Sequence, residues 1–306
     1  MRRLAYVFVA VLVLLSAISG FVGHAIGASV LRPMRLASQR SEEISAMLQH
    51  TRATKKDFAV HAPDGIELQG WKVRPASANG SWVLLFHGVS DNRTGTVGYA
   101  ELLLRHGYNI VMMDSRAHGE SGGEIATYGW KERYDTVAIV NALYSTENVN
   151  HLYAFGVSMG AAIALQSAAV EPRIEGVIAE DPFANLREVS YDYAGLHFLP
   201  SIGETLFLPA SIFALDSFGK AGGFNPDDVS PEKEVAARPF AVLLICGTSD
   251  HTIPCRHAER IYRAALGPKE LWIVEGAEHA SAIGRNPAEY ENRVIRFLER
   301  TAGNPR

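Results

Sequence analysis

The sequence predicts an α/β fold with a mostly parallel, doubly wound sheet that is led by an antiparallel hairpin. Short, continuous apolar runs such as 82–86 and 109–113 are typical of strands buried on both faces of a parallel sheet. Segments with helical spacing alternate with these runs, which is the order of βαβ units. Near the start, two stretches with period-two alternation flank Asp64-Gly65, which indicates a hairpin. A chain of 306 residues has room for one such domain and a small addition.

The amino-terminal segment 4–31 contains no Asp, Glu, Lys or Arg. A helix needs about 20 apolar residues to cross a bilayer. We therefore expect a single-pass membrane anchor over residues 1–31, with Arg2 and Arg3 in the cytoplasm and the body of the protein outside. Small residues at 25–28 also permit a cleaved signal peptide, in which case the protein is secreted.

Residues 32–56 are polar with scattered apolar positions, and they predict a linker that contains a short helix over 41–48. The hairpin follows with strands over 58–61 and 67–73. The predicted globular domain therefore covers residues 57–306.

Further along the chain, buried strands alternate with helices. The predicted strands are 82–86, 109–113, 151–155, 174–179, 240–246 and 270–274. The predicted helices are 99–105, 131–144, the alanine-rich run after Gly160, 256–266 and 287–299. Between about 184 and 233 this alternation stops and aromatic residues mix with Leu, Pro and Gly. We expect a helical cap insertion there, with an apolar acyl or alkyl pocket or with aromatic side chains that pack the cap onto the core.

A serine lies on the turn between an apolar strand and an alanine-rich helix, in the run Gly156-Val157-Ser158-Met159-Gly160. A serine hydroxyl is a poor nucleophile that needs a base and an exposed position. A sharp strand-to-helix turn exposes the hydroxyl, and its strained backbone requires small neighbours such as Gly156 and Gly160. The pattern predicts that Ser158 is a nucleophile.

The partners of this serine are expected just past the carboxyl ends of other strands, where ligands bind in open α/β sheets. Asp250 and His279 follow two later strands, and the chain order is nucleophile, acid, histidine. His279 would take the serine proton, and Asp250 would fix the histidine tautomer. Asp181, which follows the strand after the nucleophile, is the alternative acid, whereas Asp114 is assigned a structural role.

An oxyanion that forms during acyl transfer needs two preorganised donors. Met159, the residue after the nucleophile, is expected to supply one backbone N–H at the start of its helix. The loop after the first buried strand is expected to supply the other, through the N–H of Val89.

The composition excludes several other classes of function. The formal net charge is −4 and the basic residues are dispersed, so nucleic-acid binding is set aside. No Cys/His spacing typical of a metal site is present. The cysteines Cys246 and Cys255 are interpreted as two semi-buried thiols, with a disulfide as the alternative.

Several of these motifs together resemble an α/β-hydrolase. They are His87-Gly88, Asp114…Arg116…His118-Gly119…Ser121…Gly123, Gly156-Val157-Ser158-Met159-Gly160, Gly247…Asp250…Ile253-Pro254 and Gly276-Ala277…His279. More narrowly, the chain is similar from about residue 57 onward to membrane-anchored bacterial hydrolases of the serine-aminopeptidase-like and Bem46-like branch. The resemblance implies a serine hydrolase without a cofactor, with Ser158, Asp250 and His279 as its triad.

The leading hypothesis is a hydrolase that cleaves a carboxylic ester through an acyl-enzyme on Ser158. The substrate is expected to be a small-molecule or lipid-like ester, with a lipid-derived acyl ester or thioester among the candidates. One alternative is a serine peptidase of the aminopeptidase type, which needs an acidic recess for a substrate ammonium. Its candidate residues are Glu180, Asp181, Glu188 and Asp192. A second alternative is a non-catalytic binding protein with this fold, and the oligomeric state stays open.

Overall fold

The structure, a computed structural model, describes residues 31–36, 41–194 and 208–303, together with scattered positions between 3 and 25. Its centre is an eight-stranded sheet in the order β1-β2-β4-β3-β5-β6-β7-β8. The strands are β1 (Thr54–His61), β2 (Glu67–Arg74), β3 (Trp82–Phe86), β4 (Asn109–Met113), β5 (Leu152–Val157), β6 (Ile174–Glu180), β7 (Ala241–Gly247) and β8 (Lys269–Val274).

The strand pairing confirms the predicted fold class. β1 and β2 form an antiparallel hairpin, and β2 pairs antiparallel with β4. Every later neighbour pair, from β4–β3 to β7–β8, is parallel. The carboxyl ends of β3 to β8 therefore meet at one edge of the sheet, which is the edge where the predicted site residues follow their strands.

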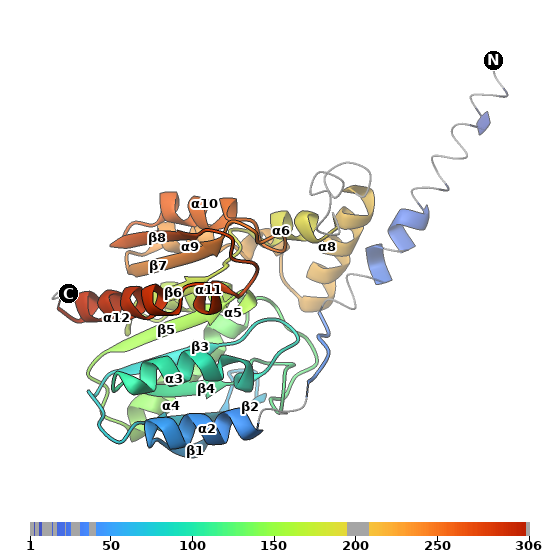
Figure 1. Cartoon of the computed structure of the whole chain (residues 1–306). Coiled ribbons are helices and arrows are strands. Elements are labelled where there is room, and N and C mark those ends of the chain that lie inside the picture. The colour runs from blue at the N-terminus through green and yellow to red at the C-terminus, as the bar shows by residue number, and fades with distance from the viewer. Residues whose placement is uncertain are drawn as a thin grey trace.

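Helices cover both faces of this sheet (Figure 1). They are α2 (Ser41–Thr51), α3 (Val97–Arg105) and α12 (Pro287–Gly303) on one face, and α4 (Glu132–Thr146), α5 (Met159–Val170), α9 (Pro231–Ala237) and α10 (Arg256–Ala264) on the other. Successive side chains of a strand point to opposite faces. Along β3, for example, Val83 packs in the core beneath α3, whereas Leu84 packs in the core beneath α5. Continuous apolar strands are needed because both layers must be filled.

Two helices of the expected cap insertion lie beside the carboxyl edge of the sheet (Figure 1). They are α6 (Leu186–Ala194) and α8 (Leu208–Gly222), followed by the 3₁₀ turn η2 (Pro226–Asp228). Phe218 and Phe224 meet edge to face in a separate apolar cluster, so these aromatics pack the cap. Of the aromatic positions expected to form a pocket, the side chains from 193 to 209 lie outside the described residues.

The predicted membrane anchor is contradicted. Segment 4–31 lies largely outside the described residues. Within the described part of the chain, no helix is both long enough and apolar enough to span a bilayer. The anchor was predicted from composition alone, whereas crossing requires about 20 apolar residues in one continuous helix. The predicted single-pass anchor, and with it the predicted membrane localisation with an extracytoplasmic body, is therefore not supported.

Residues ahead of the hairpin contribute to the core. Within the range predicted as a linker, α2 packs against α3 and buries Ile44 and Met47 in the same apolar cluster as the sheet. Leu31 is 1% exposed and joins the cap cluster. The Arg35 guanidinium donates to the backbone carbonyl oxygens of Ser121, at 2.6 Å, and Gly123. Packing therefore extends upstream of the predicted domain start at residue 57.

The two cysteines form a disulfide, which corrects the preferred interpretation as two thiols. Cys246 is the penultimate residue of β7, Cys255 directly precedes α10, and their Cα atoms are 5.4 Å apart. Such a separation lies within the range that a disulfide can bridge. The bridge closes the loop that carries Asp250.

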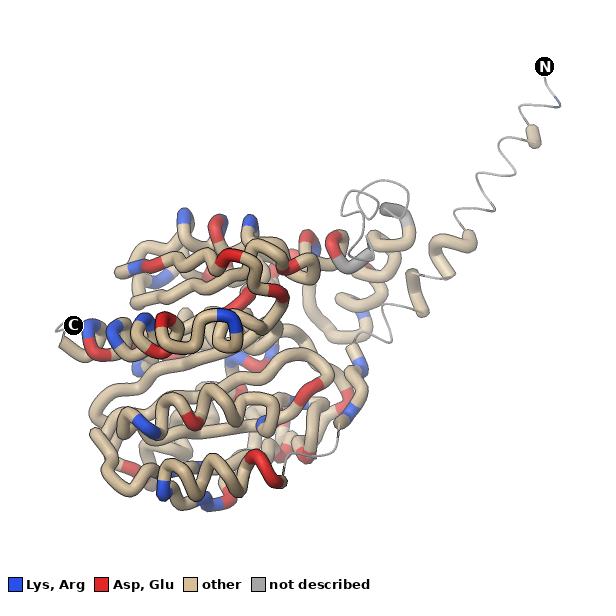
Figure 2. The backbone as a smooth tube through the Cα atoms, viewed as in Figure 1, with Lys and Arg blue, Asp and Glu red and all other residues tan. Residues whose placement is uncertain are grey.

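Acidic and basic residues are interspersed along the chain (Figure 2). Several form exposed ion pairs, such as Arg293 with Glu289 along α12. Pairs of this kind contribute roughly 0–1 kcal/mol each, because water and salt screen them.

Candidate active site

The backbone at Ser158 forms a strained turn between β5 and α5. Ser158 has φ +58° and ψ −120°, in a region that non-glycine residues rarely adopt. A Cβ atom on Gly156 would overlap the carbonyl of Gly160, and one on Gly160 would overlap the carbonyl of Phe86. The two glycines are therefore required, because the start of the helix passes against both its own strand and the end of β3.

Three predicted residues meet in a continuous chain of hydrogen bonds. His279 Nε2 lies 2.9 Å from Ser158 Oγ, and His279 Nδ1 lies 2.7 Å from Asp250 Oδ2. The other oxygen of Asp250 accepts the N–H groups of Thr252, at 2.7 Å, and Ile253, at 2.9 Å. Because the Asp250 carboxylate can only accept, Nδ1 carries the proton and Nε2 is left to accept from the serine hydroxyl.

Burial and charge act in opposite directions on His279. Burial lowers the pKa of its imidazole, but the hydrogen bond and charge of Asp250, the largest of the opposing contributions, raise the pKa above the ordinary value of 6.5. The Asp250 carboxylate therefore favours the protonated form of His279.

The alternative acid, Asp181, lies next to this series of hydrogen bonds but does not take part in it. Its Oδ2 atom is 3.8 Å from His279 Nδ1, which is too long for a hydrogen bond. That oxygen instead accepts the N–H of Ala280 at 2.7 Å. The geometry therefore favours Asp250 as the partner of the histidine.

The loop after β3 brings the other expected donor close to the nucleophile. A Cβ atom on Gly88 would be 3.7 Å from that of Ser158. Among the hydrogen bonds of the described residues, none uses the N–H of Val89 or of Met159 as donor. Both amides are thus uncommitted at the positions where the sequence analysis expected oxyanion donors.

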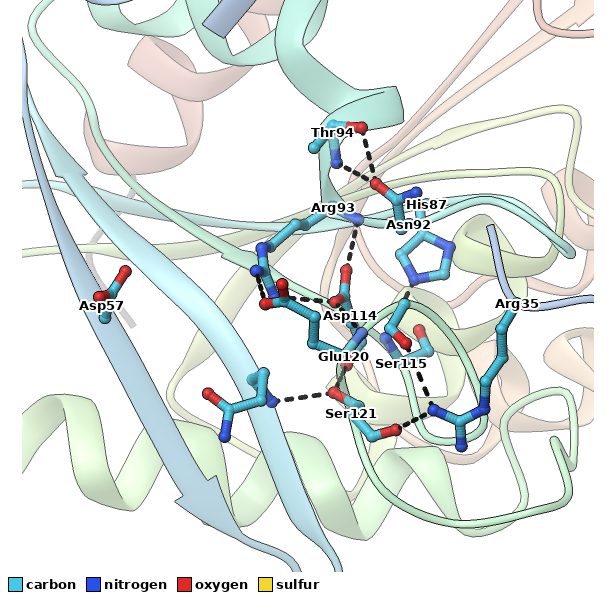
Figure 3. A network of polar contacts seen from close by, with 12 residues as sticks. Arg35, Asp57, His87, Asn92, Arg93, Thr94, Asp114, Ser115, Glu120 and Ser121 are labelled. Carbon is cyan, nitrogen blue, oxygen red and sulfur yellow. Dashed lines mark hydrogen bonds and ion pairs between the residues drawn. The ribbon is translucent and has the colours of Figure 1, made fainter. Parts of the chain in front are cut away.

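A buried histidine fixes the orientation of this loop. His87 Nδ1 donates to the Gly88 carbonyl at 2.7 Å, while its Nε2 accepts the N–H of Ser115 at 3.0 Å (Figure 3). Burial lowers the pKa of His87, which keeps the ring neutral and suited to one donor and one acceptor role. The Gly88 carbonyl and the Val89 N–H belong to one planar peptide, so holding the first also aims the second.

Asp114 has the structural role that the sequence predicted. Its carboxylate accepts the backbone N–H groups of Arg93, at 2.7 Å, and Glu120, at 2.8 Å, and it pairs with the Arg93 guanidinium (Figure 3). These bonds tie the loop after β3 to the loop after β4. Asp114 therefore stabilises the loop that carries Val89 by binding it to the loop after β4.

Within the described residues, one set of side chains could share a metal ion, because donor atoms of Asp181, Asp250 and His279 come within 4.8 Å of one another. In the present arrangement, Nδ1 of His279 is bound to Asp250 and Oδ2 of Asp181 to Ala280. An imidazole bound between a serine hydroxyl and a carboxylate in this way is typical of a triad in which the carboxylate orients the histidine.

Glu180 and His87 make contacts at the site that the sequence did not predict. The backbone carbonyl of Glu180 accepts the Ser158 N–H at 2.8 Å, and its buried carboxylate accepts the Tyr290 hydroxyl at 2.5 Å. The bonds of His87 were missed as well. An available signal was two consecutive acidic residues, Glu180 and Asp181, at the end of an apolar strand, because a buried acid needs partners.

Comparisons with known proteins agree with this fold. A family model described as "Serine aminopeptidase, S33" matches residues 78–207. The uncharacterised protein YqkD of Bacillus subtilis (strain 168) is 32% identical over 249 residues, which is 80% of this chain and 79% of YqkD. The placement in the Bem46-like branch stays a prediction.

Solved structures give the same result. The Pyrococcus furiosus esterase Pf2001 superposes with a TM-score of 0.72 and 25% identity, over 89% of this chain and 98% of the esterase. A bacterial membrane phospholipase A has the same fold, with a TM-score of 0.61 and 18% identity, over 99% of this chain and all of that chain (100%). From its sheet, its strand-to-helix turn at Ser158 and its identity to YqkD over most of both chains, the chain belongs to YqkD's family within the α/β-hydrolase superfamily.

Proposed function

We propose that this protein is a serine hydrolase that cleaves carboxylic esters through an acyl-enzyme on Ser158. His279 Nε2 removes the proton as Ser158 Oγ attacks the ester carbonyl, and the N–H groups of Val89 and Met159 hold the developing oxyanion. The imidazolium then protonates the leaving alcohol, and water repeats the sequence to release the acid. The observation that carries this proposal is the unbroken hydrogen-bonded chain from Ser158 through His279 to Asp250.

The charges around the site support an ester substrate over an amino-terminal peptide. Glu188 pairs with Arg260, and Asp192 binds both Arg256 and His257. Glu180 is fully buried, and Tyr290 donates to its carboxylate. Three of the four acids that could have received a substrate ammonium therefore already have partners within the protein, and the buried Asp181 binds Ala280.

A substrate with an apolar acyl group fits the cap better than a charged one. Cap residues Phe218 and Phe224 form an apolar cluster with Phe183, which lies two residues after Asp181. A solved esterase and a solved phospholipase A with this fold support the same reaction class. A lipid-derived acyl ester or thioester is included in this proposal.

The proposal is tested with purified protein and p-nitrophenyl esters of increasing acyl length, with amino-acid anilides in parallel. Ester hydrolysis and covalent labelling by a fluorophosphonate are the expected results. Anilides hydrolysed faster than esters would favour the aminopeptidase, and the absence of both turnover and labelling would leave a non-catalytic binding protein.

The rate is expected to depend on pH through His279. The imidazole acts as a base only when it is neutral, and its pKa lies above 6.5. The kcat/KM should therefore rise with pH through an acidic limb whose midpoint lies above pH 6.5. A matched profile for Asp250→Asn should move the midpoint downward, because Asp250 makes the largest contribution that raises this pKa. An unchanged midpoint would contradict the assignment of His279 as the base.

A further inference from the structure

Asp181 occupies an unusual position for an acidic residue that the proposed mechanism does not use. It is 2% exposed and has φ +50°, in the left-handed region that favours glycine. Its N–H donates to the carbonyl of Ile245 in β7 at 2.9 Å, which holds the backbone in that conformation. A strained residue persists only where its surroundings fix it, and such residues cluster at functional sites.

The side chain of Asp181 is bound to the turn that carries His279. Its Oδ2 accepts the N–H of Ala280 at 2.7 Å, and Ala280 also has a positive φ of +55°. The imidazole leaves the backbone one residue earlier, so this hydrogen bond fixes the base of the histidine side chain. The turn is otherwise exposed, because both Glu278 and Ala280 face solvent.

The surroundings of Asp181 disfavour a negative charge on it. Its Oδ1 is buried and has no hydrogen-bond partner among the described residues. The titratable groups that face it are Glu180 on β6, Asp250 after β7 and His279 after β8, and the Tyr99 and Tyr290 hydroxyls lie behind Glu180. Burial and the charges of Glu180 and Asp250 raise the pKa of Asp181 to about 8.

Asp250 differs from Asp181 in its partners. It receives Thr252, Ile253 and His279 as donors, so its negative charge is satisfied. Two adjacent buried carboxylates separate in charge when one has more donors than the other. Asp181, which has fewer donors, is therefore the carboxyl of the pair that is held neutral.

Resting on the proposed function, we propose that Asp181 is a positioning residue, held as the neutral acid, which fixes the His279 turn through Ala280. It orients the imidazole between Ser158 and Asp250 and takes no part in proton transfer. A neutral carboxyl also avoids a second negative charge beside Asp250.

Two substitutions at Asp181 distinguish the effect of its hydrogen bond to Ala280 from the effect of its charge state. Asp181→Ala removes the acceptor for Ala280, and we expect kcat to fall at least tenfold with little change in KM. Asp181→Asn keeps an acceptor oxygen and resembles the neutral acid, so it should recover most of that loss. A loss with Asp181→Asn as large as that with Asp250→Asn would make Asp181 the catalytic acid and overturn the proposal, as would full activity in Asp181→Ala.

The charge state is tested by stability, without any substrate. A buried carboxyl whose pKa is about 8 in the folded state and 3.8 in the unfolded state destabilises the fold progressively as pH rises between those values. The Tm of Asp181→Asn should match that of the wild type near pH 4 and exceed it increasingly up to pH 8. Asp228→Asn, an exposed Asp-to-Asn control, should show no such trend. A Tm difference for Asp181→Asn that is constant over this range would overturn the neutral assignment.

A third measurement distinguishes failure of this inference from failure of the proposed function. The Nδ1 proton of His279, bound to Asp250, should give a downfield proton NMR signal in the resting protein. Asp181→Ala should broaden or shift this signal and Asp181→Asn should restore it, whether or not an ester is hydrolysed. An unchanged signal in Asp181→Ala would overturn the positioning role, whereas absent ester turnover with the expected NMR changes would count against the proposed function alone.

Discussion

Ser158→Ala is expected to abolish ester hydrolysis, with a loss of about six orders of magnitude in kcat where the wild-type rate permits that range. The alanine removes the atom that forms the acyl-enzyme, and the remaining groups have nothing to activate except water. The variant should also fail to react with a fluorophosphonate. Initial rates on the best p-nitrophenyl ester and intact-mass analysis after labelling provide the measurement.

The fold of this variant should be intact. The hydroxyl of Ser158 bonds the His279 side chain, and the strained backbone is held by the hydrogen bond from the Ser158 N–H to the Glu180 carbonyl. The Tm is therefore expected to change little. Ser145→Ala, at an exposed position on α4, is a matched control that should keep the full rate. Substantial labelling of Ser158→Ala would contradict the assignment of the nucleophile.

The second large effect is expected for Asp250→Asn, which should lower kcat by roughly 10⁴-fold. An asparagine keeps the shape of the side chain, but an amide cannot stabilise the imidazolium, and it permits the wrong tautomer of His279. Because Oδ1 of Asp250 also accepts two loop N–H groups, the amide can place its oxygen there and present its NH₂ to the histidine. Steady-state kinetics at several pH values would measure the loss.

Asp181→Asn and Asp228→Asn are the comparisons for this experiment. The distances to His279 Nδ1, 2.7 Å from Asp250 and 3.8 Å from Asp181, predict that only Asp250→Asn causes a loss of this size. Equal losses for Asp250→Asn and Asp181→Asn would mean that Asp181 also serves as a catalytic acid, which would overturn its positioning role. Asp228→Asn, at an exposed position, should leave kcat unchanged.

The sequence was most informative at the ends of the strands. Ser158, Asp250 and His279 could be found because a parallel sheet brings the residues after its strands to one edge, whatever the loops do in detail. The fold class followed from continuous apolar runs for the same reason. Such local patterns are predictive because the physical cause of each, burial on both faces or position at a strand end, can be identified from the sequence alone.

Contacts that depend on the path of the loops could not be predicted. The Cys246–Cys255 bridge depends on the path of the loop between them, and the bond from Asp181 to Ala280 joins two turns that are distant in sequence. The anchor prediction failed for a different reason. Hydropathy counts the apolar residues of segment 4–31, which lies largely outside the described residues, and within the described part of the chain no helix is long and apolar enough to span a bilayer.

The packing of the segment before the hairpin determines where the chain can be shortened. A truncated protein that begins at residue 57 keeps every catalytic motif, but it loses Leu31, Ile44 and Met47, which are all buried. Vacating a buried Leu, Ile or Met position costs about 2–5 kcal/mol, and a whole domain is stable by only about 5–15 kcal/mol. It also loses Arg35, which holds the loop after β4. We therefore expect the smallest stable form of this protein to begin at or before Leu31, well ahead of the first recognisable motif.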